Sequence, residues 1–282
     1  MFTGFEIFGF TVYMYGLLIT IGAAVGTLIV VFRKNYRSIQ KTDIFYSLCY
    51  ALVGVLIGSK LLFVLVSLGD IITYINSDYF SFRDLTSFIG SGFVFYGGLL
   101  GGILGLYIYT KRFKLSFIDM LDTVIVGVPL VHAFGRIGCF CAGCCYGIPF
   151  HQPIGMIFKD SPFAPKVPLL PIQLYEACFN ILIFIILLLY SRKLNTSGHK
   201  ESNKLKESKG KMMTKGPNSP GRITALYLIL YSIGRFVLEF FRYDEMRGIL
   251  FSLSTSQYIS ILLFIIGMII WIDPSKIHKR RR

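Results

Sequence analysis

The stretch GRIGCFCAGCCYG, residues 135–147, decides how this sequence is interpreted. It places one arginine, four glycines and four cysteines in thirteen consecutive positions of an otherwise apolar chain. Four cysteines so close together suggest a metal or redox site. The alternative is a ligand site that depends on the arginine and the glycines, in which the cysteines are incidental. The sequence on either side bears on this choice.

The composition is that of a membrane protein. Of the 282 residues, 54% are hydrophobic and only 16% are charged, and the mean hydropathy is +0.63. These values indicate a polytopic membrane protein. The net charge of +14 does not indicate nucleic-acid binding, because the basic residues lie in short clusters between apolar runs and in the C-terminal tail. We therefore expect membrane lipid, and no nucleic acid, as a partner.

Seven apolar stretches are long enough to cross a membrane as helices of roughly 20 residues. They cover residues 10–32, 44–67, 91–109, 117–140, 172–191, 223–241 and 255–272. Residues 1–9 hold no Lys or Arg, and no convincing cleavage site follows, so we expect a retained first helix rather than a secretory signal. The expected fold is a single all-α polytopic membrane domain over residues 1–282, with about seven transmembrane helices.

Basic residues in the connectors predict the orientation, because Lys and Arg accumulate on the cytoplasmic side. Basic segments lie at 33–41, 111–114, 191–222 and 273–282, and the connectors between them carry few basic residues. This alternation places the N-terminus outside and the C-terminus in the cytoplasm. Residues 192–222 are expected to be a basic, disordered cytoplasmic loop, and residues 273–282 a basic cytoplasmic tail.

Ionisable side chains inside the spans are expected to face a polar interior. Four stand out, namely Lys60, Arg136, Arg235 and Glu239, and Arg242 follows them. Arg235 and Glu239 are four residues apart and can pair on one helix face. Lys60 and Arg242 could instead extend to the outer headgroups. Three or four cations against one carboxylate leave an excess of positive charge, for which a phospholipid phosphate is the expected anion.

The glycines of FYGGLLGG, residues 95–102, allow two interpretations. Gly97 and Gly101 have the GxxxG spacing that favours close packing of helices. Alternatively, the stretch opens a broken helix whose backbone approaches a ligand, with Tyr96 at the break. The proline-rich segment 149–171 likewise allows a rigid outer flap or a plain extended connector.

The cysteine spacing CxCxxCC matches no common zinc or iron–sulfur pattern cleanly. Cys139 and Cys141 are expected to be small packing residues at a helix end. A redox pair or a metal site is the alternative, although Cys144 and Cys145 are too close in sequence for an easy mutual disulfide. We assign no metal ligand and expect no cofactor.

Seven motifs, in order over nearly the whole chain, resemble those of the bacterial prolipoprotein diacylglyceryl transferase family. They are YMYGLL (13–18), GSKLLFVL (58–65), FYGGLLGG (95–102), GRIGCFCAGCCYG (135–147), PIQLYEA (171–177), LYLILYSIGRFVLEFFRYDE (226–245) and LSTSQYIS (253–260). The resemblance implies a multi-pass enzyme of the bacterial cytoplasmic membrane. Such an enzyme moves the diacylglyceryl group of phosphatidylglycerol to the thiol of a lipobox cysteine in a prolipoprotein, and it releases glycerol phosphate.

The charge pattern and the resemblance together give the expected site. The expected catalytic residues are Tyr15, Tyr96, Arg235, Glu239, Cys139 and Cys144. The expected substrate-binding residues are Arg136, Gly147, Lys60, Arg242, Gly97 and Gly98. Three positions depart from the family pattern, since Tyr96 replaces a histidine, Cys139 an asparagine and Cys144 a glutamate. The phosphate-binding half is thus retained, while the proton-handling half is rewritten.

These departures leave open which group takes the proton of the acceptor thiol. Tyr96 could polarise the acceptor or donate to the phosphate, although tyrosine is a poor base near neutral pH. His132, one turn before Arg136, is a second candidate base or else a satisfied interior histidine. A thiolate at Cys139 or Cys144 could act as a covalent relay. The rival to the transferase is a re-purposed relative that binds an anionic lipid or a soft metal, or that transfers to a different acceptor.

Overall fold

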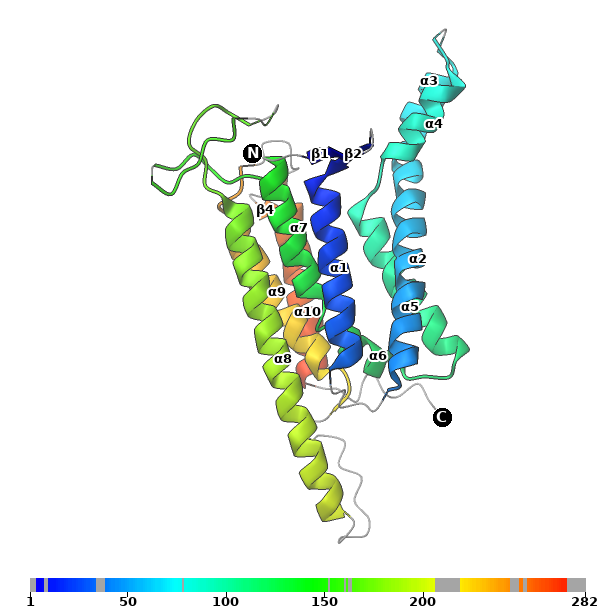
Figure 1. The fold of residues 1–282 in the computed structure, drawn as a ribbon, viewed down its shortest axis with the longest axis vertical. Helices are drawn as coiled ribbons and strands as arrows, with labels where there is room; N and C mark the ends of the chain where they lie inside the picture. Colours follow the sequence, from blue (N-terminus) through cyan, green and yellow to red (C-terminus); the bar gives the residue numbers. More distant parts are fainter. Residues whose placement is uncertain are drawn as a thin grey trace. The chain divides into compact units, whose positions relative to one another are not determined.

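The computed structural model describes residues 4–7, 10–33, 39–77, 79–151, 153–159, 161, 164–205, 219–243, 249–250 and 253–272. Within these residues the chain forms ten helices and four short strands (Figure 1). It divides into two compact units. The larger unit contains residues 1–38 and 121–282, and the smaller unit contains residues 39–120.

Five long helices build the described part of the larger unit. They are α1 (Met14–Phe32), α7 (Val128–Ala142), α8 (Ile172–Leu205), α9 (Arg222–Glu239) and α10 (Thr255–Ile272). They pack in the sequence α1 on α7, α7 on α8, α8 on α9 and α9 on α10 (Figure 1). The approach of α1 to α7 depends on a glycine, because a Cβ on Gly22 would lie 2.6 Å from the Cβ of Phe134.

Two short hairpins precede helices of this unit. Strand β1 (Gly4–Ile7) pairs antiparallel with β2 (Phe10–Tyr13), directly before α1. Strand β3 (Ile249–Leu250) pairs antiparallel with β4 (Leu253–Ser254), directly before α10. Because residues 10–13 are extended in β2, the first helix begins four residues later than predicted.

The described residues of segment 147–170, which we call the flap, fold back on themselves. The Gly147 N–H donates to the Leu170 carbonyl at 2.8 Å, and Met156 and Leu169 exchange two backbone hydrogen bonds at 2.8 and 2.9 Å. Phe158, only 2% exposed, packs against the ring of Tyr146 at a centroid distance of 5.7 Å. A folded flap, rather than a plain extended connector, therefore follows α7.

The smaller unit consists of helices that pack through glycine. It contains α2 (Lys41–Val66), α3 (Leu68–Ile75), α4 (Phe82–Ser91), α5 (Phe95–Arg112) and the first residues of α6 (Phe117–Val124). A Cβ on Gly97 would overlap the carbonyl oxygen of Gly58 on α2, and one on Gly101 would overlap that of Gly54. The helix-packing interpretation of the GxxxG spacing is thus confirmed. A bend of 65° separates α4 from α5, so the helix is also broken just before Tyr96.

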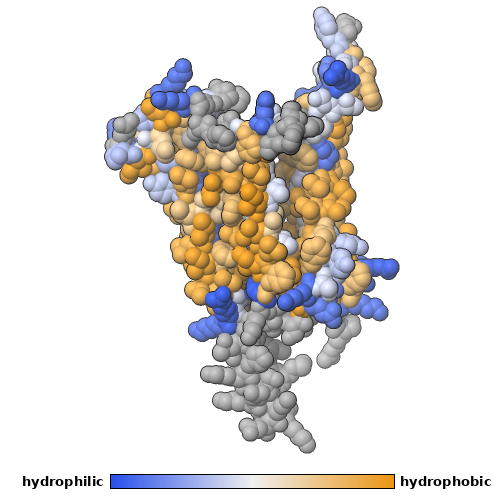
Figure 2. All heavy atoms as spheres, viewed as in Figure 1, coloured by the Kyte–Doolittle hydropathy of each residue, from blue (hydrophilic) through white to orange (hydrophobic). Residues whose placement is uncertain are grey.

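The helices are those of an integral membrane protein. Four described helices are long and apolar enough to cross a membrane, namely α1, α2, α8 over Ile172–Leu194, and α10, and there are up to six spans if α4 with α5 and α6 with α7 each form one. In each unit, apolar side chains cover the helices and hydrophilic side chains gather toward their ends (Figure 2). Exposed apolar faces of this kind match a hydrocarbon surrounding.

Each of the seven predicted spans contains a helix, but the length and apolarity of the described helices alone do not identify seven membrane spans. Helix α9 carries Arg222, Arg235 and Glu239 within 18 residues, which is more charge than a simple span holds. The predicted span 117–140 is divided into α6 and α7 by a bend of 43°. These features explain why the described helices indicate four to six spans.

Helix α8 is longer than predicted. It continues to Leu205, past the expected end at residue 191, and thus into the first part of the segment expected to be disordered. Residues 206–218 and 273–282 lie outside the described residues. The disordered loop and the basic tail therefore stay predictions.

The apolar core of the larger unit lies around the first half of α9. Its buried members are Val126, Ile183, Leu187, Leu194, Ile223 and Tyr227. Beside it the fully buried Asp122 accepts hydrogen bonds from the N–H groups of Gly221 at 2.8 Å and Thr224 at 2.9 Å, and from the Thr224 hydroxyl at 2.7 Å. A carboxylate at this position satisfies N–H groups at the start of α9 and interacts favourably with the helix dipole.

Replacing Asp122 with alanine should destabilise the larger unit, because buried N–H groups lose their acceptor at a cost of about 1–3 kcal/mol. We expect a lower midpoint in thermal unfolding of the detergent-purified protein. Asp70→Ala is the matched control, since Asp70 is exposed on α3. Equal midpoints for the two variants would contradict a capping role for Asp122.

Candidate functional site

A network of charged side chains lies at one end of the larger unit. Its centre is Glu176 in the first turns of α8, with a side chain only 4% exposed. Glu176 Oε2 lies 2.9 Å from Nε of Arg136 on α7, and Oε1 accepts from Nη1 of Arg235 on α9 at 2.5 Å. Nη1 of Arg242, just after α9, lies 3.7 Å from the same Oε1. One carboxylate thus contacts three arginines.

A second carboxylate and the start of α10 complete this network. Glu239 Oε2 lies 2.7 Å from Nη2 of Arg235, which confirms the pair predicted from the four-residue spacing. The hydroxyl of Ser254 donates to Glu239 Oε1 at 3.0 Å. Arg235 donates to the hydroxyl of Ser256 at 3.2 Å. Arg235 therefore joins α8, α9 and α10.

The network of these described side chains has an excess of positive charge. Three arginines and two glutamates sum to a formal charge of +1, on side chains between 2% and 15% exposed. A partly dehydrated cationic excess is costly unless it is compensated. A phosphate supplies the opposite charge and accepts paired guanidinium hydrogen bonds. The excess has the predicted sign, but it is smaller than predicted because a second carboxylate is present.

Glu176 is the residue that the sequence analysis missed. It belongs to the motif PIQLYEA, yet it was not counted among the ionisable side chains inside the spans. The signal was available, because Glu176 is the only charged residue between positions 172 and 191. A lone carboxylate in an apolar run calls for a cationic partner from another helix.

The cysteine-rich stretch turns back at the end of α7. Gly143, which ends the helix, has a φ of 68°, and the Cys144 N–H donates to the Cys139 carbonyl at 3.1 Å. Cys145 is also left-handed, with a φ of 61°, which is unfavourable for a residue with a Cβ. The fully buried Gln173 of α8 donates its side-chain N–H to the Cys144 carbonyl at 2.7 Å and holds this turn in place.

This turn brings three thiols together. The Sγ atoms of Cys139, Cys144 and Cys145 all lie within 4.8 Å of one another, and each is a free thiol. We call them the thiol cluster. Cys141 is outside it, because two residues along a helix differ by about 200° in direction. Hydrogen bonds from the thiols of Cys139 and Cys144 lower the pKa of the Cys145 thiol, and the guanidinium groups of Arg242 and Arg136 act in the same direction.

Gly147 connects the cysteine-rich stretch to the charge network. Its backbone pairs with that of Arg242 in an antiparallel bridge. A Cβ on Gly147 would lie 2.7 Å from the Phe241 carbonyl oxygen and 2.8 Å from that of Leu170, so a larger residue does not fit. The flap therefore fixes the backbone from which the Arg242 side chain reaches Glu176.

Tyr15 and His132 lie in the same unit as the network. The backbone of Tyr15, in the first turn of α1, packs on α7, where a Cβ on Gly138 would lie 3.0 Å from the Tyr15 Cα. Tyr15 interacts electrostatically with Arg136 and Cys139. His132 on α7 interacts with Arg136 and with Arg235, and its ring lies 5.5 Å from the ring of Tyr231.

Lys60 belongs to the smaller unit and has backbone partners there. Its Nζ donates to the carbonyls of Ile89 at 2.6 Å, Gly90 at 2.9 Å and Gly92 at 2.8 Å, and it lies 4.1 Å from the ring centroid of Phe93. Lys60 therefore satisfies carbonyl groups at the break between α4 and α5.

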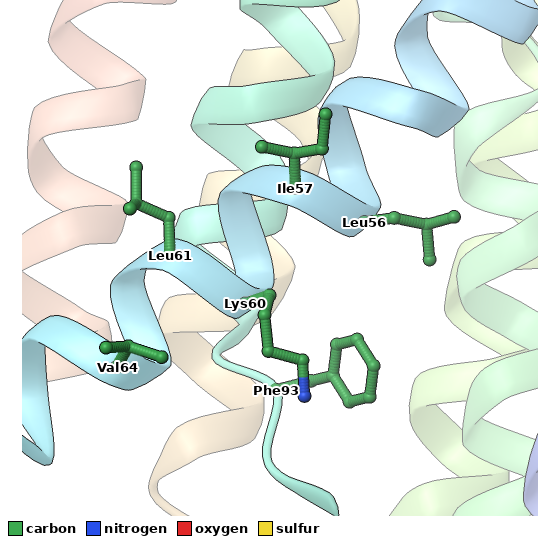
Figure 3. A pocket seen from close by; sticks show the side chains of 6 residues that line it. All are labelled: Leu56, Ile57, Lys60, Leu61, Val64 and Phe93. Carbon is green, nitrogen blue, oxygen red and sulfur yellow. The ribbon is translucent and has the colours of Figure 1, made fainter. Parts of the chain in front are cut away.

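An open apolar hollow of about 580 Å³ lies beside Lys60. Figure 3 shows the Lys60 and Phe93 side chains beside each other, with the other lining residues along α2. Those residues are Leu56, Ile57, Leu61 and Val64. A lining of this kind suits hydrocarbon rather than an anion, because Lys60 already donates to three carbonyl groups.

Tyr96, Gly97 and Gly98 also belong to the smaller unit. Tyr96 is the second residue of α5, and its side chain is 45% exposed. Gly97 and Gly98 are buried against α2, where a Cβ on Gly98 would lie 2.5 Å from the Ser59 hydroxyl oxygen. Packing thus explains why these positions are glycine, and substrate binding by them stays a prediction.

Comparison with known proteins supports the resemblance suggested by the motifs. A sequence model of the prolipoprotein diacylglyceryl transferase family matches residues 3–273. The chain is 37% identical over 268 residues to a phosphatidylglycerol-prolipoprotein diacylglyceryl transferase of Clostridium tetani, with 95% of each chain covered. It is 36% identical to such a transferase, numbered 2, of Clostridium perfringens, with 94% of this chain and 92% of the relative covered. For the transferase of Clostridioides difficile the identity is 32%, with 98% and 96% covered.

Replacing Glu176 with glutamine should destabilise the larger unit, because three guanidinium groups then share one carboxylate. Removing one partner from a buried ion pair costs about 3–5 kcal/mol. Thermal unfolding in detergent should show a lower midpoint, and the double variant with Arg242→Gln should recover part of the loss because it restores the original net charge. Glu6→Gln, at an exposed position of β1, is the control. A Glu176→Gln midpoint equal to that of Glu6→Gln would rule out this central role.

Proposed function

Since the chain belongs to the prolipoprotein diacylglyceryl transferase family, we propose that it transfers the diacylglyceryl group of phosphatidylglycerol to the thiol of a lipobox cysteine in a prolipoprotein. The observation that carries this proposal is the network of three arginines around Glu176 and Glu239. Its excess of one positive charge suits the binding of one phosphodiester anion.

The transfer forms one bond and breaks one. The acceptor sulfur attacks the glycerol carbon next to the phosphate, and the C–O bond to the phosphate breaks, so that glycerol phosphate leaves with the electron pair. Arg136 and Arg235 stabilise the charge that develops on the leaving phosphate. Glu176 and Glu239 hold these guanidinium groups in place and reduce their mutual repulsion. Gly147 and Arg242 complete the phosphate side of the site.

The acceptor side must remove a proton from the thiol. Tyr15 and His132 interact electrostatically with Arg136, and Tyr15 also interacts with the three cysteines of the thiol cluster. Tyr96 is proposed to polarise the acceptor thiol or to donate to the phosphate. This role, and substrate binding by Lys60, Gly97 and Gly98, rest on the motifs.

We further propose seven transmembrane spans, with the N-terminus outside and the C-terminus in the cytoplasm of a bacterial cell. The alternation of basic connectors supports this orientation. A helix within each predicted span supports the number, and Arg235 and Glu239 of α9 are paired within the ion-pair network. The membrane is then the cytoplasmic membrane, where phosphatidylglycerol and newly exported prolipoproteins meet.

The direct experiment uses purified protein, phosphatidylglycerol labelled in its glycerol phosphate, and a lipobox peptide. We expect release of glycerol phosphate coupled one to one with a mass increase of the peptide. The same peptide with serine in place of cysteine should remain unmodified. Restoration of lipoprotein modification in cells depleted of their own transferase tests the activity in a membrane. The proposal would be refuted if the purified protein bound the lipid without releasing glycerol phosphate and the depleted cells did not regain lipoprotein modification.

Replacing Arg235 with glutamine should lower the rate of transfer by about 100-fold to 1000-fold, because a preorganised partner of the leaving phosphate is lost. Arg222→Gln is the matched control on the same helix, since Arg222 packs over the Trp271 ring at 5.0 Å and is outside the network. Both variants are measured in the labelled-lipid assay at equal amounts of folded protein. An equal loss in the two would show that helix stability, rather than the phosphate, is affected.

Replacing Tyr96 with phenylalanine should lower transfer while leaving the fold intact. Only the hydroxyl is removed, and the half-exposed ring needs no new packing. General acid or base groups typically contribute about 100-fold to 10,000-fold to a rate. The measurement is turnover with the lipobox peptide, together with the melting temperature. Full activity of Tyr96→Phe would exclude a role of its hydroxyl in the reaction.

A further inference from the structure

The thiol cluster has the dimensions of a metal site. Its three Sγ atoms lie within 4.8 Å of one another. In a tetrahedral zinc site with Zn–S bonds of about 2.3 Å, two sulfurs are about 3.8 Å apart. The three thiols are thus within about 1 Å of one face of such a tetrahedron. Small side-chain rotations close this difference.

The backbone that holds these thiols is costly to form. Cys145 adopts a left-handed conformation that glycine would adopt more readily. This conformation returns Cys145 to the last turn of α7, where Cys139 is 9% exposed. Gln173 fixes the peptide that joins Cys144 to Cys145, because it donates a hydrogen bond to the Cys144 carbonyl. A strained residue held by a buried side chain marks a built site rather than a chance meeting of thiols.

The charges around the cluster favour an anionic metal complex. Three thiolates and one Zn²⁺ sum to a charge of −1, and the neighbouring network carries an excess of +1. Cys145 interacts electrostatically with both Arg242 and Arg136. The guanidinium groups of Arg242 and Arg136 therefore lower the cost of holding an anionic complex in a partly dehydrated region.

We propose that Cys139, Cys144 and Cys145 bind one thiophilic divalent ion, Zn²⁺, and leave its fourth position for the thiol of the acceptor cysteine. This inference rests on the proposed transferase function and names the group that prepares its acceptor. Cys144 is exposed, which provides an entry path for the ion and for the acceptor. Three protein ligands with one open position are typical of catalytic rather than structural zinc.

The proposed reaction begins with an ordinary metal–thiol exchange. The acceptor thiol replaces water at the fourth position, and its proton passes to solvent, because a thiol that coordinates zinc is deprotonated. The metal-bound sulfur then forms the bond to the glycerol carbon as glycerol phosphate leaves. The thioether product is neutral and a weaker ligand than a thiolate, so the fourth position is released.

The first experiment measures metal in the full chain purified without chelators, by mass spectrometry. We expect about one zinc per chain in the wild type and in Cys141→Ser, which is the matched control in the same stretch. Cys139→Ser, Cys144→Ser and Cys145→Ser should each weaken zinc binding by more than about tenfold in a competition with a chelating dye. Melting temperatures identify any variant that fails to fold.

The second experiment replaces zinc with Co²⁺ in the wild type and needs no lipid. The cobalt protein should show the absorption of a tetrahedral ion and sulfur-to-cobalt charge transfer. Charge transfer should increase by about one third when a lipobox peptide adds a fourth thiolate, and it should stay constant with the serine peptide. This readout does not depend on turnover.

The outcomes separate the inference from the proposed function. A wild-type chain that transfers diacylglyceryl but binds neither zinc nor Co²⁺ overturns the metal site and leaves the transferase standing. Equal zinc binding by folded Cys144→Ser and Cys141→Ser also overturns it. A cobalt spectrum that responds to the cysteine peptide supports acceptor binding at the metal. If no transfer occurs in that same preparation, the proposed function fails while the metal site stands.

Discussion

The shared carboxylate of Glu176 is the constraint on which the rest of the larger unit depends. It contacts Arg136 from α7 and Arg235 from α9. These two ion pairs fix the positions of α7, α8 and α9 relative to one another along their axes. A shift of one turn in any helix would move a guanidinium group by about 5.4 Å and leave a buried charge uncompensated. Pro171 directly before α8 supports this register, since a proline is tolerated at a helix start and disfavours an earlier one.

Helix α9 is fixed at both of its ends. Asp122 accepts hydrogen bonds from backbone N–H groups at its N-terminal end, and Arg235 and Glu239 pair at its C-terminal end. The apolar core packs near the first of these ends, around Ile223 and Tyr227. Contacts at both ends of one helix explain how its charged side chains are held in fixed positions. The cost of burying them is offset by packing elsewhere on the same helix.

The sequence predicted the class of fold and the ion pair of Arg235 with Glu239, and the misses have physical causes. Apolar length predicts helices well, so each expected span contains one, whereas the extended hairpin at residues 10–13 and the bend inside 117–140 depend on local pairing and breaks. The four-residue spacing predicted the pair of Arg235 and Glu239 because both partners lie on one helix. Glu176 pairs only across helices, and no spacing encodes such a contact.

The contacts within the cysteine-rich stretch are likewise not encoded by sequence spacing. Its sequence contains four thiols and does not say which of them meet, because the answer depends on two left-handed residues after the helix end. Gly143 is an ordinary helix-ending glycine, whereas the residue type of Cys145 does not predict its left-handed conformation. Once the turn is formed, Cys141 separates from the other three thiols. The motif therefore indicated the family, whereas the grouping of its thiols depends on the local backbone geometry.

The flap also has a use for engineering. Two hydrogen bonds pin its ends together, one from the Gly147 N–H to the Leu170 carbonyl and one from the Leu170 N–H to the Ile148 carbonyl. Loop-closure entropy grows only slowly with length, so a longer insert between the pinned ends adds little conformational cost. An epitope or a fluorophore-binding peptide placed beside the exposed Ile154 would then report on this segment from outside the bundle. The backbone that carries Arg242 would keep its position.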